Sequence, residues 1–400
     1  MSKQKKLVPE LRFPEFKSDA TWFRMLIGDI AFSESSNMAL NKLELKTKGY
    51  PVYGADSIVG YIDYFQHQGK YISIVKDGSG VGRLNLCQSQ SSILGTLTSL
   101  KSKDSENYDL DWIYYLLNTI DFSVYVKGAG IPHIYYSDFK NEPIAVPKFL
   151  EQQKIASCLS SLDEVIAAYS QKLELLKEQK KGLMQNLFPR EGEKVPKVRF
   201  KEFKKDGEWD EKKLEVLARR GSGHTPNKQK SKYYNGGINW VSLADSNKLD
   251  KRYIYSTKIH ISKEGIENSS AVLHPAGAVI LSRDAGVGKS AVLYSEMAVS
   301  QHFIVWVCDE SKLSNWFLYY CLQILKPVFE SIAVGSTIKT IGLPYFKELS
   351  ILVPSINEQQ KIASCLSALD ELIAAQADKI EQLKLHKKGL MQGLFPQLKD

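Results

Sequence analysis

A stretch of 39 residues occurs twice in this sequence of 400, and that duplication constrains the fold more than any other feature. Residues 151–189 and 358–396 are identical at 29 of 39 positions without a gap. A shorter echo precedes each copy, because Val8, Pro9, Arg12, Phe13, Phe16 and Trp22 recur in order as Val195, Pro196, Arg199, Phe200, Phe203 and Trp209. The chain is therefore predicted to contain two copies of one structural cassette.

Each copy of the repeat has the pattern of one long helix. Apolar residues step by alternating intervals of four and three, which is typical of a coiled-coil seam. Ser355 and Glu358 form a capping-box pattern at the start of the second copy, and Pro189 and Pro396 close the two copies. At about 1.5 Å per residue, each helix would span roughly 50 Å. The predicted seam comprises Ile155, Leu159, Leu162, Ile166, Leu173, Leu176, Ile362, Leu366, Leu369, Ile373, Ile380 and Leu383.

Two interpretations of this seam are open. An isolated apolar stripe is typical of an ordinary bundle helix packed on its own domain. Two nearly identical seams in one chain can instead pair with each other, and antiparallel pairing would place the preceding domains at opposite ends of a rod. The duplication favours the second interpretation.

The segments between the repeats are predicted to be mixed α/β (α+β) domains. Strand-like runs such as 71–75 and 303–307 alternate with glycine-rich turns, and one helix in each half carries Trp112 or Trp316. The expected parts are an N-terminal segment 1–18, a first domain 19–150, a helical spacer 151–189, a linker 190–205, a second domain 206–357, a second spacer 358–396 and a tail 397–400.

Composition places the chain among multi-domain globular proteins. Four hundred residues exceed what one core usually holds, and no apolar run approaches the roughly 18 residues of a membrane span. Leu7 to Glu10 occupy the place where a signal peptide needs its apolar run, so a cytoplasmic protein is expected. Five cysteines without a C-x-x-C pair suggest buried free thiols and no metal site.

The charge suits a polyanionic partner but does not establish one. The net charge is +8, and residues 204–357 hold 20 Lys and Arg against 15 Asp and Glu, whereas residues 17–150 hold 13 against 14. The richest basic stretch, residues 219–234, mixes cations, hydroxyls and aromatics in a loop. That mixture can reach phosphates and base edges, although a solvated lysine-rich loop would have the same composition.

Each candidate catalytic motif in the sequence lacks a residue that the chemistry requires. Gly286, Gly288 and Lys289 resemble the end of a P-loop, but Arg283 stands where its first glycine is required. Because the first half carries Gly80 to Arg83 at the equivalent place, a glycine turn that presents a cation, or a simple hairpin turn, accounts for both. Methyltransferase, cofactor-glycine and helicase motifs are missing, and nuclease-like triplets such as 44–46 lack a partner acid. No catalytic residue is expected.

Several motifs resemble those of specificity subunits of Type I restriction-modification systems. G-x-G-H-T-P at 221–226, followed by Y-Y-x-G-G-I-x-W at 233–240, is similar to the opening of their target-recognition domains. Residues 50–55 and 60–62 are similar to an alternative opening. Residues 335–341 and 353–354, with the E-Q-Q-K-I-A helix, match the path from recognition domain into conserved helix. The resemblance covers nearly the whole chain.

This resemblance implies a non-catalytic DNA reader. Two target-recognition domains, separated by an antiparallel helix pair, would each read one half of a bipartite site in double-stranded DNA. The chain would bind two methyltransferase subunits and, through them, two restriction-translocation subunits. It would hold no cofactor itself, whereas S-adenosylmethionine, ATP and Mg²⁺ would belong to the partners.

Thirteen residues are predicted to contact DNA. The first domain has Ile131, Pro132 and His133 where the second has Ile338, Lys339 and Thr340, so the two half-sites should differ. The candidates are Lys76, Ser79, Arg83, His133 and Tyr135 in the first domain and Thr225, Lys228, Lys230, Lys232, Arg283, Lys289, Ser336 and Lys339 in the second.

Two other classes of function compete with this interpretation. A restriction or modification enzyme with an unrecognised active site would cleave or methylate DNA without a partner. A coiled-coil adaptor would give no sequence-selective footprint even with the methyltransferase present.

Overall fold

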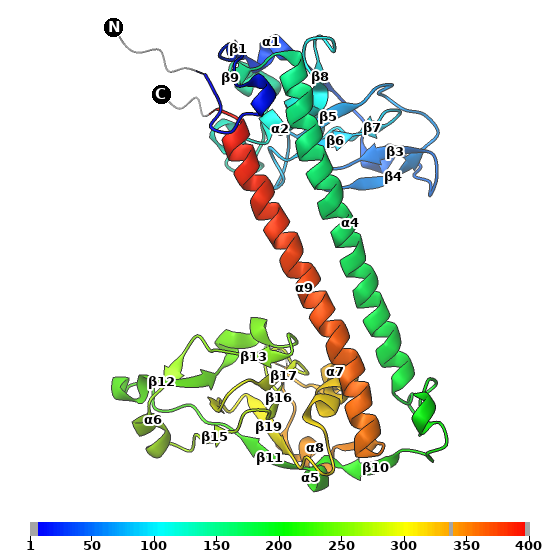
Figure 1. The fold of residues 1–400 in the computed structure, drawn as a ribbon, viewed down its shortest axis with the longest axis vertical. Helices are drawn as coiled ribbons and strands as arrows, with labels where there is room; N and C mark the ends of the chain where they lie inside the picture. Colours follow the sequence, from blue (N-terminus) through cyan, green and yellow to red (C-terminus); the bar gives the residue numbers. More distant parts are fainter. Residues whose placement is uncertain (1–6, 336–338, 397–400) are drawn as a thin grey trace. The chain divides into compact units, whose positions relative to one another are not determined.

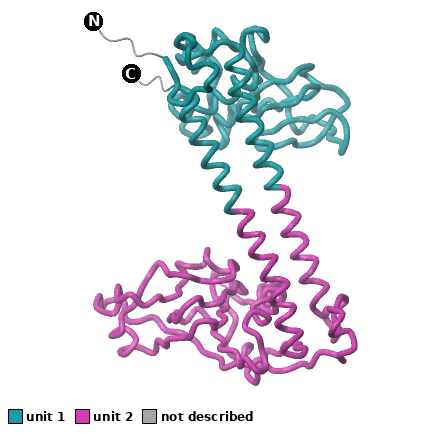
Figure 2. The backbone as a smooth tube through the Cα atoms, in the orientation of Figure 1, with its two compact units in different colours: residues 1–170, 378–400 teal, residues 171–377 magenta. Residues whose placement is uncertain are grey.

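The computed structural model describes residues 7–335 and 339–396. The chain divides into two compact units, of which unit 1 comprises residues 1–170 and 378–400 and unit 2 comprises residues 171–377 (Figure 2). Each unit is an α/β assembly that includes part of both long helices. No described helix is long and apolar enough to cross a membrane.

Unit 1 is built around a four-stranded antiparallel sheet in the order β2-β8-β5-β6. A smaller sheet, β4-β3-β7, and the pair β1-β9 complete it (Figure 1). Its elements are β1 (Phe23–Leu26), α1 (Ile27–Ile30), β2 (Ala31–Ser35), β3 (Tyr50–Tyr53), β4 (Ile58–Ile62), β5 (Tyr71–Val75), β6 (Leu84–Cys87), β7 (Ser92–Ile93), β8 (Leu97–Ser102), α2 (Leu110–Leu117), α3 (Tyr136–Phe139), β9 (Pro143–Val146) and the start of α4 (Phe149–Leu187).

Unit 2 repeats this plan with one more strand in its main sheet, β11-β19-β16-β17-β13. The pair β10-β20 and a second sheet, β14-β12-β18-β15, accompany it. Its elements are β10 (Asp210–Lys213), α5 (Leu214–Leu217), β11 (Ala218–Ser222), β12 (Tyr234–Val241), β13 (Tyr253–Ile254), β14 (His260–Ile261), α6 (Lys263–Glu267), β15 (Leu273–His274), β16 (Val279–Ser282), β17 (Ser290–Leu293), β18 (Met297–Val299), β19 (Phe303–Cys308), α7 (Asn315–Ile332), α8 (Leu343–Glu348), β20 (Ser350–Val353) and the start of α9 (Ile356–Leu394).

The two units share a scaffold and differ in their smaller sheets. Strands β2, β8, β5 and β6 correspond in order to β11, β19, β16 and β17, and β1-β9 corresponds to β10-β20. The helix after the main sheet covers it in both units: α2 packs on β5, β6 and β8, and α7 packs on β16 and β17 (Figure 1). The predicted mixed α/β fold with an internal repeat is confirmed.

A buried ion pair anchors the start of each long helix. In unit 1, Nε and Nη2 of Arg12 each donate to one carboxylate oxygen of Glu151 at 2.8 Å. In unit 2, Arg199 binds Glu358 in the same way at 2.8 and 2.7 Å. The carboxylate bonds raise the pKa of both arginines. The pair explains why this arginine and this glutamate recur together in the two halves.

The glutamine that follows each glutamate ties the long helix to the helix over the sheet. Oε1 of Gln152 accepts from the backbone N–H of Asp109 at 2.9 Å, and its amide donates to two backbone carbonyls at 3.0 Å. Gln359 makes three equivalent bonds, the first with the N–H of Ser314 at 3.0 Å. Since Asp109 and Ser314 are the N-caps of α2 and α7, part of the E-Q-Q-K-I-A motif is structural.

In unit 1, the first half of α4 lies antiparallel to the end of α9. Ile155 and Leu159 share a core with Phe395, and further along Lys387 binds Asp163 at 2.5 Å. Asp163 also accepts from the hydroxyl of Tyr115 at 2.8 Å. Burial, and then the neighbouring aspartate, raises the pKa of this tyrosine, so its hydroxyl remains a donor.

Unit 2 contains the same arrangement with the helices exchanged. Ile362 and Leu366 share a core with Phe188, while Lys180 binds Asp370 at 2.6 Å. The hydroxyl of Tyr320 donates to Asp370 at 2.7 Å, and Lys180 lies 5.5 Å from the centre of the Tyr320 ring. Each unit thus joins the two long helices through a tyrosine, an aspartate and a lysine.

Four residues of the apolar seam follow the first interpretation. Ile155, Leu159, Ile362 and Leu366 pack into the core of their own unit, as ordinary bundle helices do. Other seam residues are also buried or half-buried, and two of them, Leu369 and Ile380, are 6% and 5% exposed.

Two local predictions need correction. Ser355 accepts from the N–H of Glu358 at 3.4 Å, but the Glu358 carboxylate binds Arg199 and does not complete the capping box. The five cysteines are free, as predicted, yet only Cys87 and Cys321 are buried. The other three are half-buried, and one of them, Cys308, packs against the margin of the core of unit 2.

Candidate nucleic-acid interface

A glycine-containing turn joins two neighbouring strands of each main sheet. In unit 1 the turn links β5 to β6 and is closed by the N–H of Gly82 and the carbonyl of Val75 at 2.9 Å. In unit 2 it links β16 to β17, and Gly288 and Ser282 make the same bond at 2.9 Å. A side chain at Gly288 would meet the backbone and side chain of Lys326, and its φ of 84° favours glycine. In both units the turn joins antiparallel strands, whereas a P-loop joins a strand to a helix.

In unit 1 a second loop lies beside this turn and brings four predicted DNA contacts together. Gly78 donates to the carbonyl of Pro132, and Ile134 donates to that of Lys76, both at 2.9 Å. The aromatic rings of His133 and Tyr135 lie 5.3 Å apart. The half-buried or exposed residues on this surface include Lys76, Ser79, His133 and Tyr135.

Arg83 lies at the far end of the same turn. Its guanidinium forms an ion pair with the exposed carboxylate of Asp56, and both side chains remain largely accessible. An exposed pair of this kind contributes little to stability, so a phosphate could replace the aspartate at low cost.

The turn and the second loop bonded to it are called the frame below. Unit 2 builds the same frame from different side chains. The N–H of Ile341 donates to the carbonyl of Arg283 at 3.0 Å, matching the bond between Ile134 and Lys76. Thr340 lies opposite Asp284, as His133 lies opposite Asp77. The equivalence of 131–133 with 338–340 therefore holds at its described positions. Lys339 is exposed, and Ser336 lies outside the described residues.

Arg283 stabilises the frame, and little of its side chain is accessible at the surface. Its Nε donates to the carbonyl of Gln301 at 3.1 Å and its Nη1 to that of Ile341 at 3.2 Å, and the side chain is only 21% exposed. Lys289 is half-buried and extends along Gly286. Both were predicted as DNA contacts, and Arg283 has fewer free donors than the sequence implied.

Sequence reasoning missed a hydrogen-bonded cluster at this place. Asp284, 8% exposed, accepts from Nδ1 of His302 at 2.7 Å and from the hydroxyl of Thr340. The backbone carbonyl of Asp284 accepts from the hydroxyl of Ser282 at 2.6 Å. The signal was the aspartate that follows a cation in both halves, Asp77 after Lys76 and Asp284 after Arg283.

The basic loop of unit 2 borders a cleft of about 650 Å³. Thr225 and Lys228, both predicted contacts, line it together with Trp240, Gln301 and His302. Lys230 is exposed on the same loop.

Lys232, on the same loop, is already engaged by an acid. It forms an ion pair with Glu264, which raises the pKa of the lysine. A phosphate would therefore have to compete with Glu264 for this cation.

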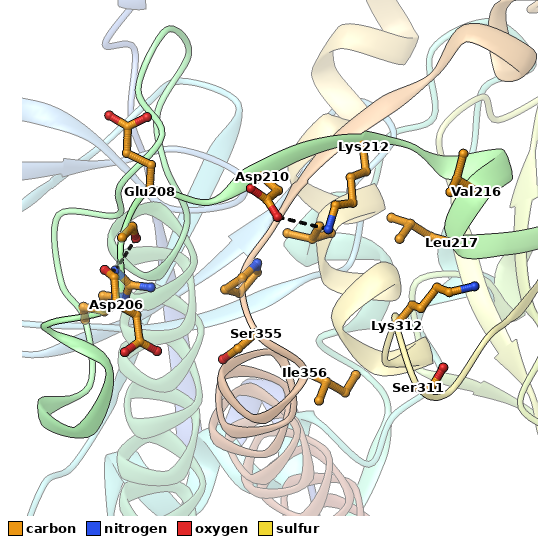
Figure 3. Close-up of a pocket in the computed structure, with 14 residues that line it drawn as sticks. Asp206, Glu208, Asp210, Lys212, Val216, Leu217, Ser311, Lys312, Ser355 and Ile356 are labelled. Atoms are coloured by element: carbon orange, nitrogen blue, oxygen red, sulfur yellow. Dashed lines mark hydrogen bonds and ion pairs between the residues drawn. The ribbon is translucent and has the colours of Figure 1, made fainter.

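A second hollow in unit 2 has no excess of positive charge. It lies where α9 begins and is lined by Asp206, Glu208 and Asp210 as well as by basic residues (Figure 3). Lys212 is paired with Asp210 at 3.0 Å, and Nη1 of Arg199 donates to the backbone carbonyl of Asp206. Among the described residues, no group of three or more His, Cys, Asp or Glu side chains could hold a metal ion.

A family model described as the Type I restriction modification DNA specificity domain matches residues 20–178 and again residues 206–385. The chain belongs to this family. Each matched region contains one set of sheets and most of the long helix that follows it. The predictions of a specificity subunit, of DNA sequence recognition as its task and of a non-catalytic role are therefore confirmed.

Curated relatives carry the same description. The Type I restriction enzyme MjaVIII specificity subunit of Methanocaldococcus jannaschii is 24% identical over 343 residues, which are 81% of this chain and 78% of that protein. The EcoR124I/EcoR124II specificity subunit of Escherichia coli is 25% identical over 302 residues, 71% of this chain and 68% of that protein.

Solved structures agree on the fold. The S subunit of the Type I restriction-modification system of M. genitalium is 17% identical and has a TM-score of 0.67, covering 98% of this chain and all of that one. A structure of a type I system that addresses complex assembly and conformational transition matches with a TM-score of 0.53 at 15% identity. It covers 93% of this chain and 97% of that one.

Proposed function

We propose that the chain reads an asymmetric bipartite DNA site, with one half-site for each unit. The observation that carries the proposal is the frame built twice from different side chains. The turn and loop of unit 1 present His133 and Tyr135, whereas the matching positions of unit 2 hold Thr340 and Gly342. Base edges in the major groove are distinguished by their pattern of donors and acceptors, so different side chains on one frame favour different sequences.

The thirteen predicted contacts are proposed to have different roles. Exposed lysines on loops, such as Lys228, Lys230 and Lys339, suit phosphates, which position a protein without reading sequence. His133, Tyr135 and Thr225 can offer directed hydrogen bonds and suit base edges. Arg283 is proposed to support the frame, since two of its donors are engaged by backbone carbonyls.

The two long helices are proposed to set the distance between half-sites. Each has 39 residues, and the tyrosine, aspartate and lysine contacts fix the helix segments to each other within each unit. Half-sites read from one face of the duplex have centres about one helical turn, roughly 34 Å, apart. Helices of this length can serve as that ruler.

Recruitment of partners completes the proposal. The duplication gives each half an equivalent surface, so two methyltransferase subunits can bind by pseudo-two-fold symmetry and carry two restriction-translocation subunits. S-adenosylmethionine, ATP and Mg²⁺ would then be bound by these partners, and the complex would act in the cytoplasm, where its DNA lies. The solved structure with a TM-score of 0.53, which matches this chain in fold, addresses complex assembly in a type I system.

Selection of methylated duplexes from a random pool tests the proposal. The full chain is combined with a methyltransferase subunit and S-adenosylmethionine, and modified duplexes are sequenced. Two different half-sites separated by a fixed unread spacer are expected. A continuous or palindromic site, or methylation by the chain alone, would contradict the proposal.

A further inference from the structure

The cleft of unit 2 is lined by groups that donate hydrogen bonds. Gln301 is exposed at its edge, and the hydroxyl of Thr225 donates to Oε1 of Gln301 at 2.5 Å. This contact orients the amide, so that both N–H groups of Nε2 are left to point away from Thr225. Lys228 adds a cation to the same lining.

The histidine in the cleft is held by the buried cluster beneath it. Nδ1 of His302 bonds to the carboxylate of Asp284 at 2.7 Å, and therefore carries its proton. The ring is thereby fixed, with Nε2 as its remaining polar atom. Trp240, whose Nε1 donates to the carbonyl of His224 at 3.1 Å, forms an apolar wall of the cleft.

Unit 1 cannot make the same contact from the matching place. The N–H of Lys76 donates to the carbonyl of Thr96 at 2.9 Å, just as the N–H of Arg283 donates to the carbonyl of His302 at 3.0 Å. Thr96 therefore corresponds to His302, and the residue before it, Gly95, corresponds to Gln301. The side-chain amide is therefore present in unit 2 and absent from the matching position of unit 1.

We propose that this cleft reads a purine at one position of the half-site of unit 2, with Gln301 as the specificity-determining residue. This inference rests on the proposed function. Adenine and guanine both present N7 as an acceptor in the major groove, whereas cytosine presents a donor there and thymine presents O4 beside its methyl group, away from the position of N7. The amide N–H of Gln301 donates to N7, while Lys228 neutralises a nearby phosphate.

The test uses the full chain with its methyltransferase subunit and a duplex pool randomised over the bound site. Gln301→Ala should reduce purine preference at one position by roughly 5- to 150-fold and leave the other half-site unchanged. Gln301→Glu should move the preference at that position to cytosine, whose amino group donates to a carboxylate. Gln229→Ala is the matched control, because Gln229 is exposed on the neighbouring basic loop and does not line the cleft.

Each outcome is decisive. A uniform loss of binding without a change in preference would mean that Gln301 contacts a phosphate, and unchanged preference would mean no contact; both overturn the inference. Thr225→Val should relax the same position, because it frees the amide while leaving the Gln301 side chain in place. A wild-type chain that selects no sequence would instead refute the proposed function.

Discussion

At the scale of single residues, removing one partner of the buried ion pair of Arg199 and Glu358 should be strongly destabilising. Glu358 is 1% exposed, so Glu358→Ala leaves a buried guanidinium without its partner. We expect a loss of about 3–5 kcal/mol in the free energy of unfolding, measured by chemical denaturation. Glu174→Ala, which breaks an exposed pair with Lys177, should cost less than about 1 kcal/mol.

The double variant Arg199→Met with Glu358→Leu separates the pair from its parts. Replacing both charges with apolar side chains removes the desolvation cost, so the double variant should be more stable than Glu358→Ala. A double variant as unstable as Glu358→Ala would show that the attachment of the long helix depends on the charges of this pair.

The residue scale also shows what the sequence alone could not supply. Thr225, Lys228 and Lys339 lie on the loops where their composition placed them. The contacts of Asp284 with His302 and Thr340 join residues that are 18 and 56 positions apart, so only the folded sheet reveals them. The sequence predicts that an isolated cation such as Arg283 is a surface group, but backbone carbonyls engage two of its donors.

At the scale of elements, the two aspartates that join the long helices should differ in importance. The Asp370 side chain is 10% exposed and the Asp163 side chain 40%, although both accept from a tyrosine and a lysine. Asp370→Ala should cost about 1–3 kcal/mol, because Tyr320 and Lys180 lose the largely buried acceptor that they share, and Tyr320 keeps only its contact with Ser367 at 3.2 Å. Asp163→Ala should cost clearly less, since water can replace the carboxylate.

Hydrogen–deuterium exchange on the two variants can locate these effects. Asp370→Ala should increase exchange in α7 and the adjoining part of α9, and Asp163→Ala should have a smaller effect around α2. Equal effects at the two sites would contradict the burial argument.

Element boundaries followed from local rules where side chains act locally. The repeat, closed by Pro189 and Pro396, predicted both long helices within two residues of their observed ends. The strand-like runs 71–75 and 303–307 correspond to β5 and β19, because they are short apolar runs bounded by turns. The smaller sheets were not foreseen, since strands of two residues such as β14 and β15 exist only through pairing with distant partners.

At the scale of the whole molecule, the ruler proposal makes a quantitative prediction. Inserting four residues into α4 between Asp163 and Lys180, and four into α9 between Asp370 and Lys387, leaves the contacts within each unit intact. The insertions add roughly 6 Å to each helix, which is about two base-pair steps. The selected site should therefore keep both half-sites and gain about two base pairs of spacer.

The same four residues inserted after Gly192 provide the control, because this exposed turn follows the end of α4 and lies outside both long helices. That variant should select the unaltered spacer. If the helix insertions changed a half-site, or left the spacer as it was, the helices would not set the spacing. The distance would then have to be fixed by the partner subunits, and the duplicated helices would act only as their binding surface.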